Sequence, residues 1–393
     1  MIRRSTVVLL FLLLAHAGVL ASYAKPPRVF LLDGGELQKL KDAKATDATL
    51  KAWLAEIDKK ATKALKVEIG YVVTKTGLPP SGDKHDYMSQ APYFWRNPDT
   101  ATGLPYVRRD GERNPEIKNF PDHDQMDKMV VTVEQLALGH YLTGDERYAA
   151  RAAEILRAWF VQPATKMKPN LEYAQAVPGQ NTGRGTGIIE SRGLTRVVDA
   201  VGLLQGSKAW SDKDQKDIQD WFSSYLDWLI GSKNGKAESN AKNNHGTFYD
   251  VQVAGFALFV GRKELAKSTI EAAKKKRIDE QVTPDGKQPL ELERTKAMSY
   301  STMNLDGLLS LAKLGESVDV DLWEYKSADG RSIRRAIEFF FPFTGGEKWP
   351  YKQIEPFDNE SFYRLMRRAA RKYKDAAFQK MMSTVPAGGS IAR

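Results

Sequence analysis

Apolar residues recur at intervals of three and four positions along most of the chain after residue 35, with polar residues between them. This spacing predicts amphipathic helices, whereas the strict alternation expected of strands is scarce. Turn and helix-start signals separate the segments at Gly144–Asp145, Ser211–Asp212 and Asp358–Asn359. The pattern therefore indicates a mainly α protein. The predicted helices are Glu36–Leu65, Gln125–Leu142, Glu146–Phe160, Gly187–Leu204, Asp212–Leu229, His245–Val260, Lys263–Gln281, Ser299–Leu314, Ser332–Phe341 and Asn359–Tyr373.

Short turns join most of these helices, which favours antiparallel helix hairpins. So many hairpins fit a helical barrel or toroid of stacked pairs better than a simple bundle, although no strict sequence repeat is visible. We therefore expect residues 25–393 to form a single domain with an (α/α) toroid or incomplete barrel.

Two long stretches interrupt the helical pattern. Thr74–Asp124 is rich in Pro, Gly, Tyr and Trp, and Val161–Thr186 is equally poor in periodicity. Loops of this length inside a compact domain are usually functional or disordered, and the aromatic content of the first argues against disorder. We expect both loops to form the walls of a substrate cleft.

The first 24 residues resemble an export signal. Arg3 and Arg4 precede the apolar run Val7–Leu14, and Ser22–Ala24 offers small residues for cleavage before Lys25. The alternative is a membrane anchor, but the apolar run is shorter than the roughly 20 residues that a spanning helix needs. We expect cleavage after Ala24, a periplasmic or secreted protein, and no membrane association of the mature chain.

The composition narrows the class of partner. The 393 residues include no cysteine, which excludes disulfides, thiol catalysis and Cys-ligated metals. The formal net charge of +10 favours an anionic partner, although it is equally explained as a solubility feature. Export and the lack of a basic tract with stacking aromatics argue against nucleic acid, which leaves acidic glycans. We expect a monomer that acts on an anionic polysaccharide.

A polar cluster begins the predicted helix at residue 245. Asn243, Asn244 and His245 are followed by Gly246, a combination poorly suited to a core and well suited to a polar site. One asparagine could merely cap the helix, but capping does not explain all three polar side chains. His140, in the middle of an amphipathic helix, is more easily explained as structural.

A second cluster, Glu291–Ser301, contains Arg294 and Tyr300 at the approach to another helix. Alone this pair is weak evidence for a catalytic site, because the start of a helix often carries a salt-bridged arginine and a buried tyrosine.

Four segments together resemble the alginate lyase domain family. They are NNHGTFYDVQ at Asn243–Gln252, ELERTKAMSYSTMNL at Glu291–Leu305, DYMSQAPYFWRNP at Asp86–Pro98 and KWPYKQI at Lys348–Ile354. The resemblance implies a polysaccharide lyase with an (α/α) toroid fold. It also implies an Asn-His pair on one helix and an Arg…Tyr pair on another, which correspond here to the catalytic residues Asn244, His245, Arg294 and Tyr300.

These residue types suit β-elimination from a uronate. Asn244 and Arg294 would neutralise the sugar carboxylate and so stabilise the enolate-like transition state. Tyr300 would remove the C5 proton and protonate the O4 leaving group; its reference pKa is about 10, and Arg294 nearby would favour the phenolate. His245 would act as base for the opposite C5 epimer, or would bind the carboxylate and orient Tyr300, the role we favour for mannuronate.

Further polar and aromatic residues are candidates for substrate binding, with stapling of the long loop as the alternative for the aromatic ones. They are Tyr87, Gln90, Tyr93, Trp95, His123, Arg184, Glu190, Arg192, Asn243 and Tyr249. No metal-ligand motif appears, and GRGTG at residues 183–187 lacks the phosphate-loop pattern, so we expect neither a metal nor a cofactor.

The expected substrate is mannuronate-rich alginate, with β-1,4-glucuronan as the second choice. A glycoside hydrolase of the same fold would need two paired carboxylic acids, for which Glu190, Glu291 and Glu293 could be nominated. A non-catalytic glycan-binding protein is the third alternative.

Overall fold

The computed structural model describes residues 25–43 and 48–386, and the proposed signal peptide lies outside this range. Helices dominate, as the sequence pattern predicts. They are α1 (Gly34–Ala43), α2 (Ala48–Ala64), α3 (Asp122–Thr143), α4 (Glu146–Phe160), α5 (Leu194–Leu204), α6 (Asp212–Gly231), α7 (Lys233–Ser239), α8 (Asn244–Phe259), α9 (Lys263–Ala273), α10 (Pro289–Leu292), α11 (Ala297–Gly315), α12 (Ile333–Glu338), α13 (Phe341–Thr344), α14 (Asn359–Lys372) and α15 (Ala376–Thr384).

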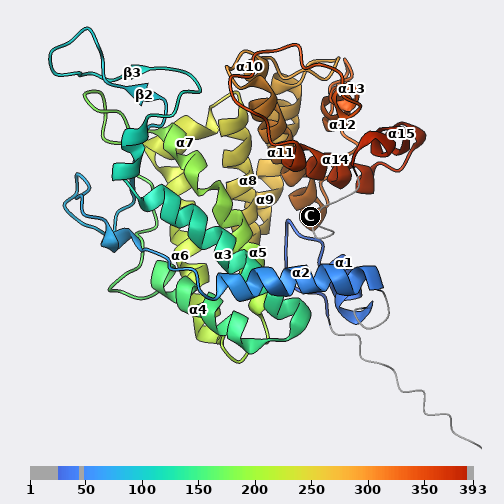
Figure 1. Cartoon of the computed structure of the whole chain (residues 1–393), viewed down its shortest axis with the longest axis horizontal. Helices are drawn as coiled ribbons and strands as arrows, with labels where there is room; N and C mark the ends of the chain where they lie inside the picture. Colours follow the sequence, from blue (N-terminus) through green and yellow to red (C-terminus); the bar gives the residue numbers. More distant parts are fainter. Residues whose placement is uncertain (1–24, 44–47, 387–393) are drawn as a thin grey trace, which may run out of the picture.

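The helices form a toroid with α8 in its interior. Helix α8 is buried over nearly its whole length and packs against α5, α6, α9 and α11. Helix α3 packs against α2, α4 and α5, while α14 packs against α11 at the other end (Figure 1). A helix that is apolar all round belongs in the interior of a fold, and α8 thereby carries the polar cluster at its N-terminus into the middle of the molecule.

The two long loops contain short strands and lie beside each other. In one pair, β1 (Met88–Gln90) runs parallel to β4 (Tyr173–Ala176); in the other, β2 (Phe94–Trp95) is antiparallel to β3 (Val107–Arg108). The β2–β3 ribbon projects from one end of the toroid (Figure 1).

A buried lysine attaches the first loop to α3. The Nζ of Lys75 donates to the carbonyl oxygens of Val72, Lys84 and Asp86 and to the carboxylate of Asp122, at 2.7–2.9 Å. A buried ammonium is tolerated only where its donors are satisfied, so this contact fixes where the loop leaves the helices and how it enters the cleft.

Some helix boundaries differ from the sequence prediction. The segment expected as one helix from Glu36 to Leu65 forms α1 and α2, and Gly187–Leu204 begins as a 3-10 helix, Gly185–Gly193, before α5. Close packing requires a glycine within this 3-10 segment, because a Cβ on Gly187 would lie 2.5 Å from the Cβ of Ala174.

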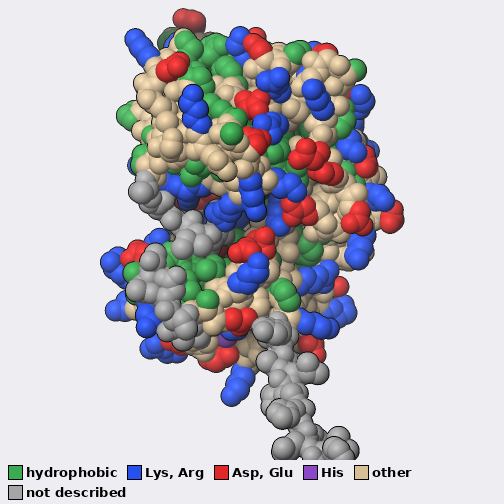
Figure 2. All heavy atoms as spheres, turned by 90° about the vertical axis from the view of Figure 1, so that its right-hand side faces the viewer, with side chains coloured by type: hydrophobic (Ala, Val, Ile, Leu, Met, Phe, Trp, Pro, Cys, Tyr) green, Lys and Arg blue, Asp and Glu red, His purple; other side chains and the backbone are tan. Residues whose placement is uncertain are grey.

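Within the described ranges, no helix is both long and apolar enough to cross a bilayer. Figure 2 shows the face that carries the C-terminal helices, where Lys and Arg side chains are mixed with Asp and Glu around a hollow.

Candidate active site

A cleft of about 610 Å³ opens where the two long loops meet the N-terminal ends of α8 and α11. The first loop contributes residues from Ser89 to His123, and the second contributes Gln175, Arg184 and Thr186. Both loops therefore form walls of the cleft, as their length and composition predicted. A neighbouring cavity of about 500 Å³ shares Arg192 and Met303 with it and continues along α3, α5, α8 and α11. The two cavities adjoin at these two residues.

The turn before α8 is held by a buried arginine. Arg277 lies in a π-helical segment, Lys274–Asp279, and donates to the carbonyl oxygens of Ser239 and Ala241 at 2.8 Å and to Asp250 at 2.7 Å. Gly246 is required here, because a Cβ at that position would lie 2.4 Å from the Arg277 guanidinium. The π-helix thus fixes the backbone that presents the polar cluster.

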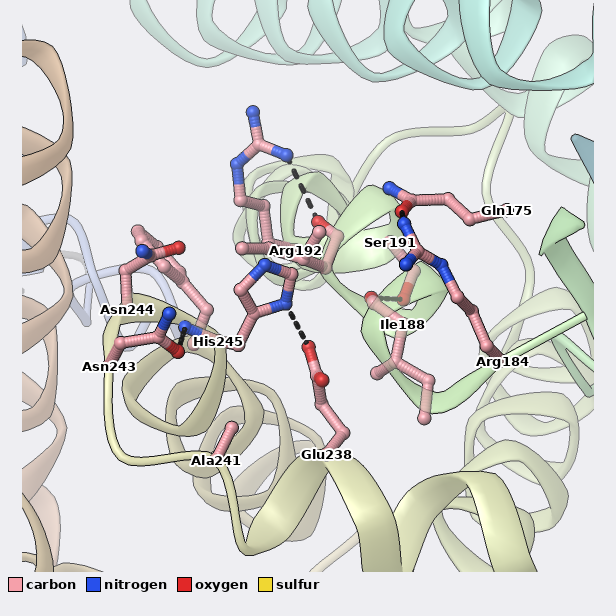
Figure 3. Close-up of polar contacts among 12 residues, drawn as sticks. Gln175, Arg184, Ile188, Ser191, Arg192, Glu238, Ala241, Asn243, Asn244 and His245 are labelled. Carbon is pink, nitrogen blue, oxygen red and sulfur yellow. Dashed lines mark hydrogen bonds and ion pairs between the residues drawn. The ribbon is translucent and has the colours of Figure 1, made fainter. Parts of the chain in front are cut away.

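His245 at the start of α8 is oriented by a carboxylate. Its Nδ1 lies 2.7 Å from Oε1 of Glu238, whose side chain is almost completely buried (Figure 3). With Nδ1 bound to a carboxylate, Nε2 is the ring nitrogen left for a proton transfer or a substrate contact. Asn243 caps the helix by accepting the backbone N–H of His245.

Asn244 is buried and tied to Glu291 of α10. Its backbone N–H donates to Oε1 of Glu291 at 2.6 Å, and its Nδ2 donates to Oε1 and Oε2 at 3.0 and 2.8 Å. Burial raises the pKa of Glu291, and the hydrogen bonds from Asn244 oppose that shift.

Arg294 and Tyr300 form one unit. The guanidinium carbon of Arg294 lies 3.7 Å from the centroid of the Tyr300 ring, and its Nε and Nη2 donate to the carboxylate of Asp110. The Tyr300 hydroxyl donates to the Tyr93 hydroxyl at 2.7 Å. A lysine could not reproduce this arrangement, because its ammonium group cannot both lie over the Tyr300 ring and bind the Asp110 carboxylate through two nitrogens.

The electrostatics leave Tyr300 as a neutral phenol in the ligand-free protein. Burial raises its pKa well above the ordinary value, as does the neighbouring Tyr93, and the positive charge of Arg294 only partly offsets these effects. We expected Arg294 to favour the phenolate; its contribution has that sign but is outweighed by desolvation. Burial also works against ionisation of Asp110, yet the hydrogen bonds from Arg294 and Thr295 hold its pKa well below the usual range.

Arg184 lies in the wall opposite α8. It is 4.9 Å from the centroid of the Phe94 ring and donates to Oε1 of Gln175 at 2.8 Å. Gln175 is one of two non-glycine residues with positive φ in the described part of the chain, at 50°. Such strain persists where the surroundings impose it, and here it directs the Gln175 amide toward Arg184 (Figure 3).

Several of the buried polar atoms that lack a hydrogen-bond partner in the described structure belong to the cleft. Among the residues that line it, they are Nε2 of Gln90, Nδ1 of His123, Nε of Arg184, Oγ1 of Thr186 and Oδ1 of Asn244. Burying polar groups unpaired costs free energy, and a polar ligand that enters the cleft would meet these atoms.

Most of the residues singled out from sequence come together here. The cleft is lined by Gln90, Tyr93, His123, Arg184, Glu190, Arg192, Asn243, Asn244, His245, Arg294 and Tyr300.

Three of the substrate-binding candidates lie elsewhere. Tyr87 is fully buried and donates to Glu190 at 2.7 Å, and the Tyr249 hydroxyl donates to the carbonyl oxygen of Leu229. Trp95 sits outside the lining with its indole N–H on the carbonyl oxygen of Glu112. Tyr87 and Tyr249 therefore pack in the interior with satisfied hydroxyls rather than facing a sugar. Trp95 belongs to the projecting ribbon, and its contact with substrate stays a prediction.

Sequence reasoning missed Glu238, Asp110 and Gln175, and it assigned Glu291 only to the hydrolase alternative. Glu291 is bound to Asn244 and is absent from the cleft lining, while Glu190 accepts hydrogen bonds from Tyr87 and Ser89. Neither is placed as one of two carboxylic acids flanking a sugar bond. Asp110 was missed because its partner Arg294 is distant in sequence, whereas Glu238 and Gln175 lie within ten residues of His245 and Arg184 but carry no motif that marks the contact.

No group of three or more metal-ligating side chains occurs among residues 25–43 and 48–386.

The comparisons identify the fold and the family. The family model described as alginate lyase matches residues 72–349, which is more than half of the chain. The chain belongs to the alginate lyase family. It is accordingly a polysaccharide lyase, as the sequence motifs predicted, and the (α/α) toroid is the fold of the alginate lyases it matches.

Solved structures of alginate lyases resemble this family member over most of its length. An alginate lyase from Bacteroides ovatus is 36% identical with a TM-score of 0.88, and the match covers 92% of this chain and 97% of that one. A histidine-to-alanine variant of alginate lyase A1-III, complexed with a tetrasaccharide, is 15% identical with a TM-score of 0.58 over 91% of each chain. Alginate lyase A1-III from Sphingomonas species A1 is 13% identical with a TM-score of 0.53, covering 84% and 90%. The two A1-III comparisons show the fold alone. No curated protein sequence matches the chain.

Proposed function

We propose that this polysaccharide lyase cleaves mannuronate-rich alginate by metal-independent β-elimination at the cleft between α8 and α11. The observation that carries the proposal is the convergence of Asn244, His245, Arg294 and Tyr300 on one cleft, although they come from two segments about 50 residues apart. The alginate lyase named among the solved structures at 36% identity supports the choice of polymer.

The charge distribution suits an anionic substrate. Arg108, Arg113, Arg184, Arg192 and Arg294 all line the cleft. Arginines bind carboxylates through paired N–H donors, so successive uronates of one chain would each find a partner. The adjoining cavity along the inner helices provides length for a polymer.

Tyr300 is suited to protonating the leaving O4, since it rests as a neutral phenol. To act also as base at C5, it must first release its own proton to solvent; as a phenolate it then removes the C5 proton and passes that same proton to O4. This dual role fits mannuronate, in which the C5 proton and O4 lie on one face of the ring.

His245 offers a second base for the opposite C5 epimer. Glu238 holds Nδ1, so that Nε2 is available to the substrate. For mannuronate we assign His245, with Asn244 and Arg294, to binding of the C5 carboxylate, whose neutralisation stabilises the enolate-like transition state.

The test is a panel of poly-mannuronate, poly-guluronate and β-1,4-glucuronan, followed by the ultraviolet absorbance of the new C4–C5 double bond. The proposal requires the highest kcat/KM on poly-mannuronate. A higher kcat/KM on glucuronan would support β-elimination but would make glucuronan the substrate in place of alginate. No increase in absorbance with any of the three polymers would refute the proposed function.

A further inference from the structure

The amide of Asn244 is turned with its oxygen away from Glu291. Both hydrogen bonds of Nδ2 go to the Glu291 carboxylate, and Oδ1 is buried without a partner in the described structure. Asn244 lines the cleft and Glu291 does not. In this state, Asn244 therefore offers the cleft an acceptor rather than a donor.

This orientation conflicts with binding of a uronate. An ionised carboxylate only accepts hydrogen bonds, so the Asn244 oxygen would repel it, and the Glu291 charge behind would add to the repulsion. Neutralising the substrate carboxylate requires Nδ2 to face the cleft, and that in turn requires Glu291 to donate to Oδ1.

We propose that Glu291 takes up one proton from solvent when a uronate binds, and that this proton reverses the Asn244 amide so that Nδ2 donates to the substrate carboxylate. Oε1 of Glu291 continues to accept the backbone N–H of Asn244, as it does at 2.6 Å. Its protonated Oε2 then donates to Oδ1 of Asn244, which removes the unpaired buried acceptor. Glu291 is thus a positioning residue, and the inference rests on the proposed function.

The surroundings of Glu291 favour this uptake. Its side chain is 1% exposed, and burial disfavours the ionised form. The titratable groups that face it are Arg294 and His245, which both oppose protonation. Arg294 is already bound to Asp110 and His245 to Glu238, so each has its own carboxylate partner elsewhere. A substrate carboxylate arriving beside Asn244 adds a like charge, which raises the pKa of Glu291 further.

Proton uptake can be measured with the Tyr300→Phe variant, which retains the ring but cannot complete catalysis. Binding of a tri-mannuronate is followed by calorimetry in two buffers of different ionisation enthalpy. We expect a net uptake approaching one proton in Tyr300→Phe, its loss in Glu291→Gln/Tyr300→Phe, and its retention in His245→Gln/Tyr300→Phe. Binding without uptake, or uptake that survives Glu291→Gln and disappears with His245→Gln, overturns the proposal.

Activity provides a second readout that does not depend on the Tyr300 variant. Glutamine has the shape of a protonated Glu291, because its amide nitrogen donates to Oδ1 of Asn244 while its oxygen accepts the backbone N–H. Glu291→Gln should keep kcat/KM within about threefold of wild type, whereas Glu291→Ala should lose about 30-fold or more. If Glu291→Gln falls as far as Glu291→Ala while both keep the wild-type melting temperature, an ionised Glu291 is required and the proposal fails. Lyase activity of the wild type is scored separately, so this failure is distinct from failure of the proposed function.

Discussion

The Arg294 guanidinium lies over the Tyr300 ring, with 3.7 Å between its central carbon and the ring centroid, while its nitrogens bind the Asp110 carboxylate. One side chain thereby contacts the tyrosine ring and supplies positive charge that acts to lower the pKa of Tyr300. Asp110 comes from the first long loop, so the arrangement also joins that loop to the start of α11.

Replacing Arg294 by lysine tests whether its positive charge alone is sufficient or whether its contacts with Tyr300 and Asp110 are also needed. Lysine keeps the charge but can neither stack on Tyr300 nor bind Asp110 through two nitrogens. We expect Arg294→Lys to lower kcat/KM by about 100-fold, the size of effect seen when a donor to developing charge is lost. Arg262→Lys, at the surface ion pair with Asp227, is the matched control and should behave as wild type. Near-normal activity of Arg294→Lys would show that charge alone suffices.

The ionisation of Tyr300 can be observed directly. Because burial raises its pKa, the free enzyme should show no phenolate from Tyr300 up to pH about 10, the ordinary tyrosine value. The measurement is the phenolate absorbance of wild type minus that of Tyr300→Phe across an alkaline titration. A difference signal that appears near neutral pH would mean that the phenolate is the resting form and that Tyr300 is poised as a base.

The Glu238–His245 contact predicts a loss of activity when the carboxylate is neutralised. In Glu238→Gln the imidazole loses the charge that fixes its orientation, and we expect kcat/KM to fall at least about tenfold. The exposed Glu264→Gln on α9 is the control for the same substitution elsewhere. Unchanged kcat/KM in Glu238→Gln would remove His245 from the reaction centre.

The buried carboxyl group of Asp199 should make the stability of the folded protein depend on pH. The fully buried Asp199 carboxylate accepts the backbone N–H groups of Phe30, Leu31 and Leu32 and fastens the N-terminal segment to α5. Burial raises its pKa to about 6, against 3.8 for an ordinary aspartate, with those hydrogen bonds partly opposing the shift.

A pKa raised on folding means that the folded state holds the proton more tightly. Protonated Asp199 therefore contributes its full share to the free energy of unfolding below pH about 4. This contribution, up to about 3 kcal/mol, is lost as the pH rises to about 6 and the carboxyl group ionises. Urea unfolding of wild type and Asp199→Asn between these pH values measures it: the stability advantage of wild type should shrink as pH rises. A constant difference would show that the hydrogen bonds fully compensate for burial.

Local signals explain which parts of the fold could be predicted from sequence. Helix α4 was expected over Glu146–Phe160 and has those bounds, because Asp145 caps it and its apolar spacing is regular. The 3-10 segment before α5 was expected as α-helix. It packs closely against the second loop at Gly187 and Ala174, and no local sequence pattern encodes such a tertiary contact.

The same distinction applies to the site. The Asn244–His245 and Arg294…Tyr300 pairs were visible because each lies within one motif. Their carboxylate partners were not: Asp110 is 184 residues from Arg294, and Glu291 is 47 residues from Asn244. Tertiary packing alone brings these together, and the desolvation that keeps Tyr300 neutral likewise arises only in the folded cleft.

The most direct test of elimination is the mass of the products from a defined mannuronate oligomer. Elimination predicts two fragments whose masses sum to that of the parent, one of them with an unsaturated non-reducing end, and loss of these products in Tyr300→Phe. Fragments that sum to the parent plus one water would establish hydrolysis and contradict the account.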